Sequence, residues 1–206
     1  MSLAPGPDGR PRCSWGVSAP EYVAYHDEEW GRPVTDDRGI YERLVLEAFQ
    51  SGLSWLTILR KRDAFRAAFA GFDYERVAEF GDAEVERLLA DAGIVRNRAK
   101  IEAAIANAGA VRELAANGES LAALAWSFRP ERESAPASLE DLAATTPEST
   151  ALAKELRRRG FRFIGPTTAY ALMQATGIVN DHLAGCAVRD QVEDERRALL
   201  ESRASP

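Results

Sequence analysis

The strongest candidates for metal ligands in this chain, its cysteines and histidines, lie in two short segments. The sequence holds two cysteines and two histidines in 206 residues. Cys13 and His26 lie near the start, and His182 and Cys186 lie near the end. A structural zinc ion takes four nitrogen or sulfur ligands in a closed tetrahedron. One Cys2His2 site built from both segments would join the two ends of the chain.

Two other interpretations of these four residues stay open at this point. A buried cysteine often serves only as a small apolar side chain. A cysteine beside a histidine can also act as a nucleophile, so a thiol enzyme that uses Cys13 or Cys186 is a rival hypothesis. Alkylation with and without a chelator separates these cases, because a metal-bound thiolate is protected until the metal leaves.

Composition indicates a folded domain that lies outside membranes. Hydrophobic residues make up 46% of the chain and charged residues 28%. No apolar run approaches the roughly 20 residues of a membrane span, and the polar start of the chain lacks the pattern of a signal peptide. Two cysteines cannot form a disulfide framework, so we expect a cytoplasmic protein. The net charge of −6 argues against nonspecific nucleic-acid binding, although basic residues cluster at 60–66, 96–100 and 157–162.

The spacing of apolar residues is helical almost throughout and predicts an all-α fold. No segment shows a convincing strand pattern. The proline-rich stretch 129–147 is the most loop-like internal segment. Helices are expected around residues 40–49, 85–92, 101–108, 147–159 and 170–175.

Six segments resemble the 3-methyladenine DNA glycosylase I family, in the family's order and at compatible spacing. The resemblance covers about residues 12–187. It implies a flexible lead over residues 1–11, a glycosylase core over 12–187 and a charged tail over 188–206. The segments are RCSWGVSAPEYVAYHDEEWG, LVLEAFQSGLSWLTILRKR, LLADAGIVRNRAKI, AWSF, RGFRFIGPTT and NDHLAGC.

The resemblance implies a fold and an activity. The fold is that of the helix-hairpin-helix DNA glycosylases, with the hairpin near residues 88–101 and a zinc clip joining the N- and C-terminal segments. The clip holds one structural Zn²⁺ on Cys13, His26, His182 and Cys186. The activity is hydrolysis of the N-glycosidic bond of 3-methyladenine in double-stranded alkylated DNA by a monomer. The damaged base is flipped out of the duplex, and free 3-methyladenine and an abasic site are the products.

The resemblance also assigns the residues that bind the flipped base. Trp55 stacks on the base, Tyr25 lines its pocket, and Trp15 and Trp30 lie nearby. Adenine methylated at N3 is cationic while it is attached to the sugar, so an aromatic face contributes about 0.5–2 kcal/mol by a cation–π interaction. Without the resemblance, packing in a helix core is the simpler interpretation of these tryptophans.

Glu47 is the candidate catalytic-site carboxylate. On a helical wheel it lies beside Ile40 and Leu44, at the edge of the apolar stripe. A carboxylate there can accept hydrogen bonds from the exocyclic amine of adenine and offers negative charge to a cationic base. The family lacks the aspartate that other members of the superfamily use, so Glu47 is not assigned the role of a general base. A methylated purine is already a good leaving group.

The duplex is expected to meet two segments. Leu53 is the candidate wedge that fills the gap left by the flipped base, and Gly52 lets the backbone approach closely. The hairpin at 93–98 offers backbone N–H groups and a helix N-terminus to a phosphate. The residues assigned to this hairpin contact are Gly93, Arg96, Arg98 and Lys100.

A rival from another functional class is a non-catalytic, zinc-stabilised nucleic-acid-binding module. Such a module would keep the metal ligands and the basic clusters. It would not need Glu47, Tyr25 and Trp55 together, and their joint presence favours the enzyme.

Overall fold

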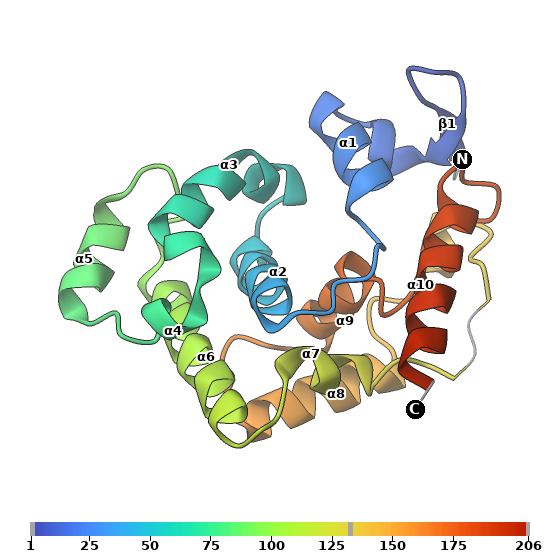
Figure 1. The fold of residues 1–206 in the computed structure, drawn as a ribbon. Helices are drawn as coiled ribbons and strands as arrows, with labels where there is room; N and C mark the ends of the chain where they lie inside the picture. Colours follow the sequence, from blue (N-terminus) through green and yellow to red (C-terminus); the bar gives the residue numbers. More distant parts are fainter. Residues whose placement is uncertain (1–2, 132–133, 205–206) are drawn as a thin grey trace.

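Helices dominate the computed structural model, which describes residues 3–131 and 134–204 (Figure 1). The expected all-α class is confirmed for the body of the chain. The helices are α1 (Pro20–Glu28), α2 (Asp37–Gln50), α3 (Trp55–Ala68), α4 (Tyr74–Val77), α5 (Asp82–Ala90), α6 (Arg98–Ala116), α7 (Leu121–Trp126), α8 (Pro147–Arg158), α9 (Pro166–Ala175) and α10 (Arg189–Ala204), with short 3-10 turns at Ser14–Val17, Ala70–Phe72 and Leu139–Asp141.

The expectation that the chain has no strand is wrong near the start. Strands β1 (Leu3–Pro5) and β2 (Pro11–Cys13) form an antiparallel hairpin that takes in most of residues 1–11, the segment expected to be a flexible lead. Buried Arg12 stabilises it by ion pairs to Asp8 within the hairpin, at 2.5 Å, and to Asp27 on α1, at 2.7 Å. The boundaries proposed for lead, core and tail remain predictions.

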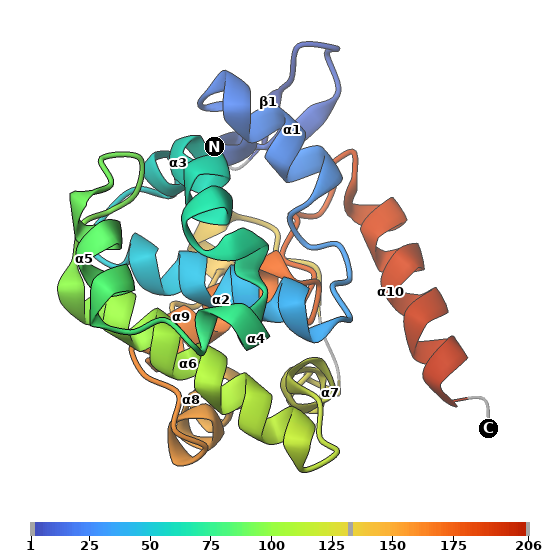
Figure 2. The ribbon, with the colours of Figure 1, turned by 60° about the vertical axis from the view of Figure 1, so that its left-hand side comes forward.

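Helix α2 is the central helix, and it packs against α3, α6, α7 and α9 (Figure 2). It begins where the side chain of Asp36 accepts a hydrogen bond from the N–H of Gly39. Its residues from Ile40 to Phe49 are almost all buried, because neighbouring helices cover it on several sides. The carboxylate of Glu47, on the buried part of this helix, therefore lies inside the molecule.

Helices α5 and α6 form the expected helix-hairpin-helix around residues 91–97. Asn97 caps α6 by accepting a hydrogen bond from the N–H of Lys100. Helix α5 starts at Asp82 itself, with Gly81 as its N-cap, and its C-cap is Asp91.

The segment after α9 returns to the N-terminal hairpin. The N–H of Ala187 donates to the carbonyl oxygen of Pro11, and the guanidinium of Arg10 donates to the carbonyl oxygen of Ala187. Both ends of the core therefore meet in one place, as a clip requires. No helix of the described chain is long and apolar enough to cross a membrane.

Candidate functional site

A cavity of about 440 Å³ opens between α1, α2, α3 and α9. Five residues that the sequence assigned to base binding or catalysis line it together. The carboxylate comes from α2, and the aromatic rings come from α1, α3 and the turns on either side of α1. These five residues are Trp15, Tyr25, Trp30, Glu47 and Trp55.

The aromatic side chains form a continuous wall. The ring centroids of Trp15 and Trp30 are 4.9 Å apart at an interplanar angle of 80°, an edge-to-face contact. The rings of Tyr25 and Trp55 are 5.3 Å apart. The indole Nε1 of Trp55 is buried and has no hydrogen-bond partner in the described chain. The wall thus combines apolar faces with one unused donor.

Glu47 is held in an environment that disfavours its charge. Its side chain is only 6% exposed, and its carboxylate accepts no hydrogen bond from the described residues. Burial raises the pKa of Glu47 from 4.5 to about 8, and the charge of Arg43 opposes part of this rise. Burial, followed by the charge of Glu47, also raises the pKa of Tyr25. A buried carboxyl with free acceptor positions is what a polar ligand can satisfy.

Arg43, one helical turn before Glu47, links the cavity to an ion-pair network. Its Nη2 donates to Glu29 at 2.9 Å, and Arg62 donates to the same carboxylate at 2.6 Å. Nη1 of Arg43 is buried without a hydrogen-bond partner in the described chain. The network fixes one cationic side chain close to the cavity.

The turn between α2 and α3 presents Leu53 to solvent. This side chain is 42% exposed, and the N–H of Leu53 donates to the carbonyl oxygen of Gln50. Gly52 has φ of +82°, a conformation that favours glycine, and a Cβ there would meet no atom within 4 Å. An exposed apolar side chain on a tight turn has the form expected of a wedge.

Lys100 lies elsewhere than the sequence suggested. Its ammonium is buried and donates to the carbonyl oxygens of Phe49 at 2.9 Å and Ser51 at 2.6 Å. It therefore satisfies the carbonyl groups at the end of α2 instead of facing outward to a phosphate. Burial lowers the pKa of Lys100. Its place makes it a residue that positions the turn carrying Leu53.

The turn between α5 and α6, predicted to bind a phosphate, agrees with the prediction only in part. The N–H of Gly93 is taken by Asp91 at 2.7 Å, so it does not face outward. The N–H groups of Val95, Arg96, Arg98 and Ala99 make no hydrogen bond within the described chain. The side chain of Arg96 is exposed, and that of Arg98 is paired with Glu86. The free donors therefore sit just after the position of Gly93.

The four predicted metal ligands form one buried cluster. The ligand atoms of Cys13, His26, His182 and Cys186 all lie within 4.8 Å of one another. The two imidazole nitrogens are 3.2 Å apart, and Sγ of Cys186 is 3.5 Å from Nε2 of His26 and 3.7 Å from Nδ1 of His182. This group could hold a metal ion.

The hydrogen bonds behind the imidazoles favour a cation in the cluster. Nδ1 of His26 lies 2.7 Å from the carboxylate of Asp27, and Nε2 of His182 lies 3.0 Å from the carbonyl oxygen of Trp30. Both partners accept, so these ring nitrogens carry the protons in the neutral imidazoles. The lone pairs of the other two nitrogens then face each other at 3.2 Å. A cation between them would remove that repulsion.

Sequence reasoning missed several residues of the cavity. Gln50 follows Glu47 by three positions and shares its helix face, which was a usable signal. Gln174 on α9 gave no signal, because α9 was recognisable only by its apolar spacing. The other lining residues not anticipated are Ser18, Tyr22, Leu142 and Ala171.

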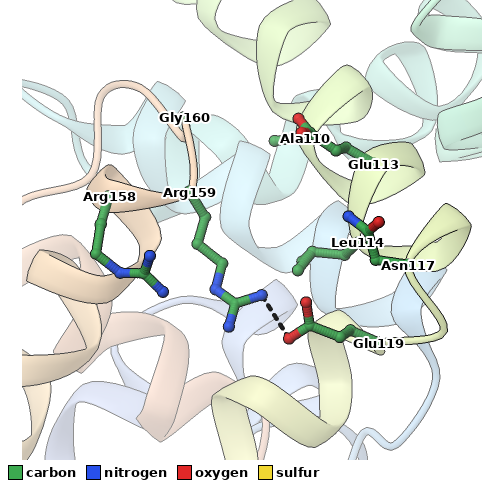
Figure 3. Close-up of a pocket in the computed structure, with 8 residues that line it drawn as sticks. All are labelled: Ala110, Glu113, Leu114, Asn117, Glu119, Arg158, Arg159 and Gly160. Atoms are coloured by element: carbon green, nitrogen blue, oxygen red, sulfur yellow. Dashed lines mark hydrogen bonds and ion pairs between the residues drawn. The ribbon is translucent and has the colours of Figure 1, made fainter.

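A second cleft, of about 480 Å³, lies between the C-terminal ends of α6 and α8 (Figure 3). Figure 3 shows Arg159 reaching across it to Glu119, at 2.5 Å. Both Arg158 and Arg159 also pair with Glu155. The basic groups are thus already neutralised, and the cleft contains none of the predicted site residues.

Comparison with known proteins agrees with the geometry. The model of the family described as methyladenine glycosylase matches residues 15–190. DNA-3-methyladenine glycosylase 1 of Escherichia coli (strain K12) is 47% identical over 178 residues, covering 85% of this chain and 95% of that protein.

Two solved structures show the same fold. A crystal structure of 3-methyladenine DNA glycosylase I has a TM-score of 0.83 at 49% identity and covers 85% of this chain and 98% of its own. A variant of 3-methyladenine DNA glycosylase I, solved in complex with 3-methyladenine, has a TM-score of 0.80 at 32% identity and covers 86% of this chain and 97% of its own. This chain belongs to the methyladenine glycosylase family.

Proposed function

We propose that this protein is a DNA repair glycosylase that hydrolyses the N-glycosidic bond of 3-methyladenine in alkylated DNA. The observation that carries this proposal is the joint placement of Glu47 and Trp55 in one aromatic cavity. Nε1 of Trp55 is buried without a hydrogen-bond partner in the described chain, and the carboxyl of the buried Glu47 accepts no hydrogen bond from it. The names of the relatives, and the complex of one of them with 3-methyladenine, support the choice of base.

The cavity suits a cationic purine better than an ordinary one. Burial makes Glu47 costly to ionise, and a cationic base beside it stabilises the ionised carboxylate. The indole of Trp55 adds a cation–π interaction with the same base. The exocyclic amine of adenine can donate to Glu47. Stabilising the positive charge that spreads to the sugar as the bond breaks is electrostatic catalysis, and it needs no proton transfer.

The target base must leave the duplex to enter this cavity. Leu53 fills the vacated stack from its exposed turn, and the free N–H groups of Val95, Arg96, Arg98 and Ala99 bind a phosphate. Double-stranded DNA is therefore the proposed partner of a monomeric enzyme. With a net charge of −6, binding depends on local basic groups such as Arg96, so it is sensitive to salt.

The proposed metal of the cluster is one structural Zn²⁺. A tetrahedron with zinc–nitrogen and zinc–sulfur bonds of ordinary length has edges of about 3.3–3.8 Å. Three distances in the cluster, 3.2, 3.5 and 3.7 Å, are close to this size, and Sγ of Cys13 lies slightly farther out, 4.0 Å from Nδ1 of His182. When bound, the ion would join the N-terminal segment, which holds Cys13 and His26, to the segment before α10, which holds His182 and Cys186. It takes no part in the hydrolysis.

The test is release of free base from methylated duplex DNA. The purified protein should release 3-methyladenine and leave 7-methylguanine in the DNA, with abasic sites formed in equal number to the released adenine. Binding of duplex DNA without release of base would favour the non-catalytic zinc module instead. Release that disappears on alkylation of zinc-loaded protein would favour the thiol enzyme.

A further inference from the structure

Gln174 lines the base cavity with an amide whose orientation is fixed from behind. Its Nε2 donates to Oδ2 of Asp181 at 2.7 Å. The hydroxyl of Tyr170 donates to the same oxygen at 2.6 Å. The three residues come from α9 and from the segment after it, so the contact is built into the packing of one wall.

The chemistry of this contact decides which atom of the amide is left for a ligand. A carboxylate only accepts hydrogen bonds, so the amide nitrogen of Gln174 must face Asp181. A rotated amide would put two acceptors against each other. The carbonyl oxygen Oε1 is therefore the free end, and it accepts no hydrogen bond from the described chain.

We propose that Oε1 of Gln174 is a specificity-determining acceptor for the exocyclic amine of adenine, with Asp181 as the residue that positions it. The inference rests on the proposed function and deepens it. Adenine carries an amine at position 6, whereas guanine and hypoxanthine carry a carbonyl oxygen there. A fixed acceptor forms a hydrogen bond with the amine and repels the carbonyl oxygen.

This role differs from that of Glu47. Glu47 can take up a proton inside the cavity and so become a donor to a carbonyl group. A glutamine amide does not titrate, and its rotation is blocked by Asp181. The fixed acceptor thus supplies the selection that a carboxyl of variable protonation cannot supply alone. Sites built around such hydrogen bonds reject ligands that leave a buried group unpaired.

The experiment compares two free bases that differ only at position 6, 3-methyladenine and 3-methylhypoxanthine. Affinities are measured by calorimetry for wild type, Gln174→Met and Gln191→Met. Gln191 is exposed on α10, so its variant is the matched control. Gln174→Met should bind 3-methyladenine about five- to hundred-fold more weakly and 3-methylhypoxanthine more tightly than wild type does, because the repelling acceptor is gone, so that the discrimination shrinks by at least the first factor. Gln191→Met should keep both affinities.

A second variant keeps the inference testable if methionine at 174 disturbs the fold. In Asp181→Asn the new side chain can donate to Gln174, so the amide is free to rotate and turn its nitrogen to the cavity. This variant should gain affinity for 3-methylhypoxanthine relative to 3-methyladenine. An unchanged ratio of the two affinities in both folded variants would overturn the inference. It would leave the proposed function standing if wild type still releases 3-methyladenine from DNA.

Discussion

The carbonyl oxygen of Trp30 lies 3.0 Å from Nε2 of His182, while the indole of Trp30 lines the base cavity. One residue therefore touches both the metal cluster and the pocket. Tyr25 and His26 repeat this arrangement, because these neighbours on α1 face the cavity and the cluster respectively. The clip and the pocket share a wall, so disturbing one should disturb the other.

Removing the metal should therefore lower both stability and activity. A ligand at about a thousand times its dissociation constant stabilises a fold by about 4 kcal/mol, which corresponds to roughly 8–16 °C in Tm for a chain of this size. Elemental analysis should find one zinc per chain, and a chelator should lower Tm and excision together. The control is Cys186→Ser, whose Tm should start low and respond little to the chelator. Wild-type protein that lacks zinc but keeps its full thermal stability would contradict the proposed zinc clip.

Stability should fall as pH rises because of Glu47. The pKa of this carboxyl is raised to about 8 in the fold, so the folded protein holds the proton more tightly than the unfolded chain. The loss of stability caused by Glu47 is absent below about pH 4.5, and it grows as the pH rises from there through the folded-state pKa of about 8. Glu47→Gln should thus be more stable than wild type at pH 9 by a few kcal/mol, with little difference near pH 4.5.

Urea unfolding at the two pH values measures this effect. Glu113 is exposed on α6, so Glu113→Gln is the matched control and should follow wild type at both. If Glu47→Gln shows the same dependence on pH as wild type, the carboxyl is not buried as described.

Leu53→Ala should weaken capture of the lesion in duplex DNA and spare binding of the free base. Only the duplex has a gap to fill, and the 42% exposure of Leu53 means that the fold loses little. Loss of about three buried carbon atoms corresponds to roughly 2 kcal/mol, or about a thirty-fold weaker complex. Binding of abasic duplex and of 3-methyladenine by the same preparation checks this. Equal losses for both ligands would indicate a packing role.

Lys100 and Arg96 should differ in how their removal affects DNA binding. Lys100→Met leaves the carbonyl groups of Phe49 and Ser51, at the end of α2, without their hydrogen bonds from Lys100, so it should lower the free energy of unfolding by roughly 1.5–3 kcal/mol and leave the salt dependence of binding unchanged. Arg96→Gln should leave stability unchanged and reduce the slope of log K against log salt by about one. Lys154→Met, at an exposed position of α8, is the control for the first variant. If Lys100→Met also reduces the slope of log K against log salt, Lys100 contacts a phosphate as the sequence predicted.

The sequence was most informative where chemistry restricts residue types. The four soft ligands had few alternatives, and the structure brings them together. Glu47 lies only at the edge of an apolar helix face, so the family resemblance, and not its spacing, marked it as a base-binding carboxylate; the structure buries it. Spacing could not reveal where the long side chain of Lys100 turns, because that depends on the end of a different helix. The hairpin of β1 and β2 was missed because these strands have three residues each and are stabilised by the ion pairs of Arg12. The role of Gln174 depends on Asp181, a contact that no local pattern encodes.

The central claim is that Glu47 selects and stabilises the flipped adenine, and single-turnover excision tests it most directly. Glu47→Gln keeps the size of the side chain but removes its charge and turns a donor toward the amine of adenine. Each group left unsatisfied costs about 1–3 kcal/mol. Excision of 3-methyladenine from duplex DNA should therefore fall about five- to hundred-fold, with zinc content and fold unchanged. A folded, zinc-loaded Glu47→Gln protein that excises 3-methyladenine at the wild-type rate would contradict the account.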